Sequence, residues 1–302
     1  MDQKFLKRLI AECPLNNFTE DENSVERHKI LDEYLEKFTD FLYKNENQLI
    51  EHLWNDYIAS SETSLLQSSV MLRRCFLFLD CAAAIYNYTA RKSRTKNNSE
   101  LAEHVSIQLQ NDLNQYKSIL LLAMNGCFNS VIVEYRSLYE SFVIGQYLVK
   151  NPDLVPIYKE YMQFQRYHLT QLVGSSKPEW DKIHDEYIKK YGTDFAKDYG
   201  WTKSKIPNKN DRKIGTLVKE CDLDDSLTVL YKFACSYVHS SAFSVSTRTD
   251  LNQIKVFFSN SMFFIESEIN DYMRESKLPT KDAIIMRNIL IFLYQDFQEV
   301  NY

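Results

Sequence analysis

The stretch SVIVEYRSLYESFVIGQYLVK, residues 130–150, is apolar around most of a helix. At 100° per residue, Glu134, Ser137 and Ser141 fall on one narrow polar strip. Almost all the other positions are apolar, which is typical of a helix covered by other helices. An Asn-Pro dipeptide follows at 151–152, and proline disfavours the helical conformation of the residue before it. The stretch therefore predicts a central helix in an all-α protein.

The rest of the chain has the same helical periodicity. Glycine and proline number only six each in 302 residues, too few for the many tight turns of a β-sandwich or barrel. No alternating strand pattern of convincing length occurs. We expect an all-α fold, a multi-helix bundle with an N-terminal helical layer. Apolar residues at three- and four-residue steps predict further helices over about 64–88, 100–124, 153–173, 179–191, 213–221, 225–241, 250–275 and 280–299.

A polar, basic segment at 91–99 offers a domain boundary. Ser99 is a suitable N-cap for the helix that follows, and Glu100 and Glu103 would lie in its first turn. The sequence thus predicts an N-terminal helical layer over 1–90 and a main bundle over 99–302. A single continuous domain is the open alternative.

Charge and apolar patterning narrow the class of protein. The chain has 36 Lys and Arg against 41 Asp and Glu, a net charge of −5, which argues against wholesale electrostatic capture of nucleic acid. No apolar run approaches the roughly 20 residues that span a bilayer, and the N-terminal segment lacks the apolar core of a signal peptide. We expect a cytoplasmic protein that does not enter a membrane.

No two of the six cysteines form a C-x-x-C pair, and most lie in apolar segments that are predicted to be helical. We expect them to be small buried hydrophobic residues and not a disulfide framework or a zinc site. Asp181, His184 and Asp185 share a helical face, but only their residue types suggest metal binding. We expect no metal and no cofactor.

Two polar groups stand out against this background. Arg136 and Glu140 lie one turn apart, roughly opposite the polar strip of the 130–150 helix. On the predicted helix 225–241, Lys232, Ser236 and His239 share one angular sector, with His239 near the helix end. Burying a charged pair is expensive unless it is fully hydrogen-bonded, so the first group is either an internal clamp or faces a wet cavity.

These residues support two interpretations, and both stay open. In the structural one, Arg136 and Glu140 tie helices together, and His239 is a satisfied structural histidine. In the functional one, Arg136, Glu140 and His239 surround one pocket, where Arg136 binds a phosphate or carboxylate and His239 transfers a proton. Its candidate ligand-binding residues are Ser236, Lys232, Trp201 and Tyr231.

Three stretches carry a family resemblance: NGCFNSVIVEYRSLYESFVIGQYLV at 125–149, DYGWTKSKIP at 198–207, and LVKECDLDDSLTVLYKFACSYVHSSAFS at 217–244. Together they resemble a bacterial family known only as domain of unknown function 5677, over about residues 100–250. The resemblance implies an all-helical bundle without an established activity. It also implies that the family motif is built from five positions, Arg136, Glu140, Trp201, Ser236 and His239.

The same stretches are similar to helical bundles of the HEPN type, several of which are RNA-cutting toxins or phage-defence effectors. Those enzymes carry an arginine followed closely by a histidine, a spacing that this chain lacks around His239. The resemblance nevertheless implies binding or metal-independent cleavage of RNA, or binding of a phosphate ligand, in stress or anti-phage defence.

The alternative function is an interaction scaffold or oligomerisation module whose polar cluster is structural. The apolar residues of the segment 250–299 exceed what one helix face needs, and with 30–58 this segment would dock a protein partner or a second copy. The apolar residues concerned are Ile254, Phe257, Phe258, Phe263, Phe264 and Ile265.

Overall fold

The computed structural model describes residues 70–93, 99–172, 177–238 and 251–301. Every regular element within these ranges is helical, which confirms the all-α prediction. The chain divides into two compact units. Unit 1 takes Met1–Tyr139 with Leu230–Tyr302, and unit 2 is Glu140–Val229. The predicted division at 91–99 stays a prediction, because most of the proposed N-terminal layer lies outside the described residues.

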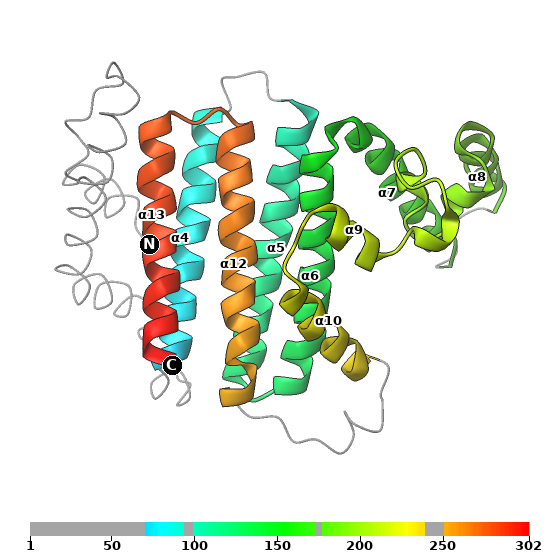
Figure 1. Cartoon of the computed structure of the whole chain (residues 1–302). Coiled ribbons are helices and arrows are strands. Elements are labelled where there is room, and N and C mark those ends of the chain that lie inside the picture. Colours follow the sequence, from blue (N-terminus) through cyan, green and yellow to red (C-terminus); the bar gives the residue numbers. More distant parts are fainter. Residues whose placement is uncertain (1–69, 94–98, 173–176, 239–250, 302) are drawn as a thin grey trace. The chain divides into compact units, whose positions relative to one another are not determined.

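Unit 1 is built on four long helices that lie side by side (Figure 1). To these it adds the first half of α6 and the last half of α10, since both helices run on into unit 2. α4, part of which falls within the predicted N-terminal layer, packs here against α5, α12 and α13. The bounds are α4 Val70–Ser93, α5 Glu100–Met124, α6 Phe128–Lys150, α10 Asp225–Val238, α12 Leu251–Glu275 and α13 Thr280–Asn301.

Local sequence explains where α5 begins and ends. The Ser99 hydroxyl accepts a hydrogen bond from the amide of Ala102 at 3.1 Å, which satisfies one of the free N–H groups of the first turn. At the other end, Gly126 takes a φ of +72°, a conformation that glycine adopts without strain. Both predicted boundaries are confirmed.

The core of unit 1 consists of apolar side chains from all four long helices, and polar contacts also join these helices. Arg74 of α4 pairs with Asp296 of α13, where its Nη2 lies 3.2 Å from Oδ1. Tyr88 donates to Asp282 at 2.7 Å. The α12 residues Ile254, Phe257, Phe258, Phe264 and Ile265 are buried in this core, and of the six only Phe263 is exposed. The expectation that this set forms a docking surface is therefore wrong.

Unit 2 contains the second half of α6, three further helices and several 3₁₀ turns. Aromatic rings fill its centre: Phe195 stacks on Tyr191 at 4.4 Å between centroids, and Trp201 meets Tyr147 and Tyr158 edge to face. These rings tie the loop between α8 and α9 to the helices. The bounds are α7 Val155–Leu172, α8 Lys177–Tyr191, η3 Thr193–Ala196, η4 Gly200–Thr202, η5 Lys209–Asp211 and α9 Ile214–Glu220.

Candidate functional site

The central helix α6 carries the first two candidate residues. Its buried side in unit 1 includes Ile132, Tyr135 and Tyr139, all inaccessible to solvent. Arg136 and Glu140 are half-buried, one turn apart on this helix. Helical periodicity predicted that both lie on the apolar side, as an internal clamp or beside a wet cavity. Neither side chain is fully buried, and the choice between the two stays open.

Arg136 lies over an aromatic ring from a different part of the chain. Its guanidinium carbon is 5.9 Å from the centroid of the Tyr231 ring on α10. Tyr231 in turn stacks on Tyr139 of α6, with 4.7 Å between centroids and 23° between planes. A cation over a tyrosine face contributes about 0.5–2 kcal/mol, more where water is excluded. Two predicted site residues, Arg136 and Tyr231, are therefore brought together in unit 1.

A larger aromatic cluster supports Tyr139. Phe264 of α12 meets Tyr139 at 6.0 Å and Tyr135 at 5.8 Å between centroids. The Tyr135 hydroxyl accepts a hydrogen bond from Asn260 at 3.4 Å, and burial raises the pKa of this tyrosine. These rings pack together across α6 and α12, so the Arg136–Tyr231 pair rests on a buried aromatic cluster.

Two further candidates lie on α10 in unit 1. Lys232 is exposed, next to Tyr231 in the chain. The Ser236 hydroxyl donates to the carbonyl oxygen of Phe233 at 2.7 Å, within the same helix. Lys232 is thus the side chain on this part of α10 that offers a positive charge to solvent, whereas Ser236 uses its only proton internally.

Glu140 belongs to unit 2, where its negative charge lies close enough to Tyr199 to affect the ionisation of the Tyr199 hydroxyl. Burial raises the pKa of the Tyr199 hydroxyl, and the negative charge of Glu140 raises it further. Tyr199 has a φ of 56°, in the left-handed region that bulky side chains seldom occupy. Trp201, two residues later, is buried among aromatic rings. That position suits a core residue, and its ligand-binding role stays a prediction.

His239, the proposed proton-transfer group, lies outside the described residues. The convergence of Arg136, Glu140 and His239 on one pocket therefore stays a prediction. Among the residues that are described, no group of three or more His, Cys, Asp or Glu side chains has an arrangement that would hold a metal ion.

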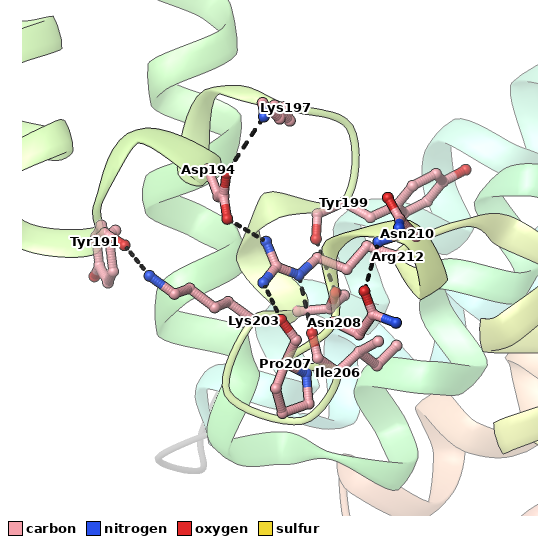
Figure 2. Close-up of polar contacts among 11 residues, drawn as sticks. Tyr191, Asp194, Lys197, Tyr199, Lys203, Ile206, Pro207, Asn208, Asn210 and Arg212 are labelled. Atoms are coloured by element: carbon pink, nitrogen blue, oxygen red, sulfur yellow. Dashed lines mark hydrogen bonds and ion pairs between the residues drawn. The ribbon is translucent and has the colours of Figure 1, made fainter.

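The loop after α8 holds a structural residue that the sequence did not single out. Arg212 is only 7% exposed, and it donates to the carbonyl oxygens of Ile206 and Pro207 and pairs with Asp194 (Figure 2). The surrounding residues 203–213 are rich in lysine and asparagine, a composition typical of a solvated loop. Lys209 is exposed, as its polar neighbours indicate, but Arg212 lies inside the loop that it closes.

Comparison with known protein families shows which family the chain belongs to. A family of unknown function, DUF5677, matches residues 88–255, more than half of the chain. The chain belongs to the DUF5677 family. No match was found among curated proteins or among solved structures.

The DUF5677 match covers every candidate residue named above, from Arg136 to His239. It confirms the family resemblance that the motifs predicted and assigns no activity. The HEPN-like relationship stays a prediction. No described helix of this DUF5677 protein is long and apolar enough to cross a membrane.

Proposed function

We propose that this protein binds the phosphate groups of RNA through two basic side chains, Arg136 on α6 and Lys232 on α10. The observation that carries the proposal is the position of the Arg136 guanidinium over the Tyr231 ring. Guanidinium groups recognise phosphate with two parallel hydrogen bonds, a geometry that depends on how the plane of the group is oriented. A ring beneath the cation fixes that plane before the ligand arrives.

The half-burial of Arg136 supports this role. A fully solvated arginine must be ordered when it binds, whereas one that rests on the Tyr231–Tyr139 stack has already lost much of that freedom. Lys232 is exposed and adjacent to Tyr231 in the chain, and would add a second contact that is independent of base sequence. With a net charge of −5 on the whole chain, local basic groups of this kind must supply the attraction.

The stronger form of the proposal is metal-independent RNA cleavage. The 2′-oxygen of a ribose attacks the neighbouring phosphorus while a base takes its proton, and the 5′-oxygen leaves with a proton from an acid. The products are a 2′,3′-cyclic phosphate and a 5′-hydroxyl end. His239 would move these protons, and Arg136 would stabilise the charged phosphorane. Such an activity suits a role in stress or anti-phage defence.

Binding is tested with a fluorescein-labelled single-stranded RNA and the full chain, by fluorescence anisotropy in the presence of a chelator. We expect Arg136→Ala to weaken binding about tenfold or more, equivalent to about 1.4 kcal/mol. Arg136→Lys keeps the charge but loses the planar fork, so it should restore little of the affinity. Lys117→Ala, at an exposed position of α5, is the matched control.

Cleavage is tested by incubating the same RNA and resolving the products on a gel. We expect His239→Ala to bind RNA like the unmodified protein but to leave it intact. If Arg136→Ala binds as well as Lys117→Ala, or the unmodified protein does not bind RNA, the proposed function is rejected. If binding depends on Arg136 but no cleavage occurs, only the stronger form is rejected.

A further inference from the structure

A buried pair of carboxyl groups lies between α5 and α12 of unit 1. Asp112 on α5 is 1% exposed, and Glu268 on α12 is 3% exposed. Gln108, one turn before Asp112, donates from Nε2 to Oε1 of Glu268 at 3.1 Å. Acidic side chains are almost never this buried unless they are paired. The proposed RNA site does not use this pair.

The second oxygen of Glu268 shows what holds the pair together. Oε2 is buried and receives no N–H or O–H donor from the described part of the chain. The Asp112 side chain nevertheless lies close enough to act on that of Glu268. Two ionised carboxylates only accept hydrogen bonds, so a hydrogen bond between them forms only when one of the two carries a proton.

The charges around the pair favour that proton. Burial raises the pKa of Glu268 well above its ordinary value, the negative charge of Asp112 raises it further, and the Gln108 amide opposes both. Asp271, one turn along α12, also raises it, although Asp271 is itself paired with Arg274 at 2.9 Å.

Glu134 and Tyr86, two other titratable groups on helices of unit 1, have contacts of their own. On α6, Glu134 accepts a hydrogen bond from Gln115 at 3.2 Å. On α4, the Tyr86 ring lies against Tyr272 of α12, 5.5 Å between centroids. His104 is buried on α5, one turn before Gln108. The variant His104→Gln, described below, distinguishes a pH dependence caused by this histidine from one caused by the carboxyl pair.

We propose that Asp112 and Glu268 hold one proton inside unit 1 at neutral pH, so that the contact between α5 and α12 is a proton-dependent element of the fold. When alkaline conditions remove the proton, two negative charges are left facing each other in the core. The helices must then separate or admit water or a cation between them.

The sign of the pH dependence follows from the two states. The unfolded chain releases the Glu268 proton near the ordinary pKa of 4.5, whereas the folded chain keeps it to higher pH. Folding therefore takes up a proton above about pH 4.5, and stability falls as pH rises until the folded pKa is passed. One proton corresponds to about a tenfold change in the unfolding equilibrium constant per pH unit.

The test is urea unfolding of the full chain between about pH 5 and pH 8. Glu268→Gln keeps the shape and donates to Asp112 without a proton. We expect it to remove the tenfold-per-unit slope and to be more stable than the unmodified protein at about pH 8. The control is Glu186→Gln, at an exposed position of α8. Because Asp112→Asn tests the same bond from the other side, both variants should lose the slope.

Two further measurements separate the alternatives. Refolding in unbuffered solution near pH 7 should take up about one proton more for the unmodified protein than for Glu268→Gln. A slope that Glu268→Gln leaves unchanged, or one of opposite sign that His104→Gln removes, overturns the proposal. Stabilisation by magnesium or calcium ions that is lost in Glu268→Gln also overturns it, since the pair is then a cation site.

Discussion

Arg212 closes the loop between α8 and α9 by donating from Nε to the carbonyl oxygen of Ile206, 2.9 Å away. Its Nη2 donates to Pro207 at 2.7 Å, and its Nη1 lies 3.5 Å from Oδ2 of Asp194. One buried guanidinium therefore satisfies acceptors on three separate residues of a segment that has little regular structure (Figure 2).

Arg212→Ala should destabilise the protein by about 3 kcal/mol, because two buried carbonyl oxygens lose charged donors. Arg212→Lys should recover only part of this, since an ammonium group cannot reproduce the spread of the guanidinium fork. Urea unfolding measures both. Lys209→Ala, at an exposed position in the same loop, should leave the midpoint unchanged. Equal midpoints for the two alanine variants would contradict the role assigned to Arg212.

Gly200 and Gly215 give opposite predictions for the same substitution. A Cβ atom on Gly200 would lie 2.4 Å from the carbonyl oxygen of Asp194 and 2.6 Å from that of Phe195. Backbone has to move to make room, so Gly200→Ala should cost about 2–3 kcal/mol. A Cβ atom on Gly215, in the helix α9, meets nothing within 4 Å. Gly215→Ala should stabilise by up to about 1 kcal/mol.

Thermal unfolding of the two glycine variants checks the pair. Gly200→Ala should lower Tm and Gly215→Ala should raise it. If both substitutions raise Tm, the close approach of the Gly200 backbone to the turn at Asp194 is wrong.

Local sequence patterns predicted the helices, but they could not predict which residues far apart in the chain are in contact. The Ser99 cap and the glycine at 126 act within a few residues, so α5 was predicted with its correct ends. Arg136 and Tyr231 are far apart in the chain, and helical periodicity places each on a face without saying which faces meet. From the sequence alone, Arg212 and Glu268 would be predicted to face solvent, because Arg212 stands among lysines and Glu268 lies on an amphipathic helix. Only their partners in the structure show that both are buried.

The cysteines should differ sharply in reactivity. Burial raises the pKa of Cys75 to about 12 and that of Cys81 to about 12, so both are protonated as well as inaccessible at neutral pH. Cys127 is exposed at the turn between α5 and α6. Brief alkylation at about pH 8, followed by peptide mapping, should label Cys127 and spare Cys75 and Cys81 until denaturant is added. Labelling of Cys75 in the native protein at the rate of Cys127 would contradict the burial of α4.

Glu160 should make α7 and α8 sensitive to acid. Lys190 donates to its two oxygens at 2.7 and 2.8 Å, and Tyr191 donates to Oε2 at 2.8 Å. Partial burial alone would raise the pKa of Glu160, but these hydrogen bonds outweigh it, and the pKa lies below its ordinary value of 4.5. The contribution to stability is therefore complete above about pH 4.5 and is lost as pH falls through the folded pKa.

Glu160→Gln should lower stability by about 1 kcal/mol at about pH 7, because a partly exposed pair contributes little more than that. The difference from the unmodified protein should shrink at about pH 3, because acid protonates the Glu160 carboxyl and weakens its hydrogen bonds from Lys190 and Tyr191. Urea unfolding at the two pH values measures this, with Glu186→Gln as the control for an exposed acid on α8. A deficit that persists unchanged under acid would mean that Glu160 acts by shape and not by charge. The effect is opposite in sign to that expected at Glu268, so the two carboxyl groups report on the two units separately.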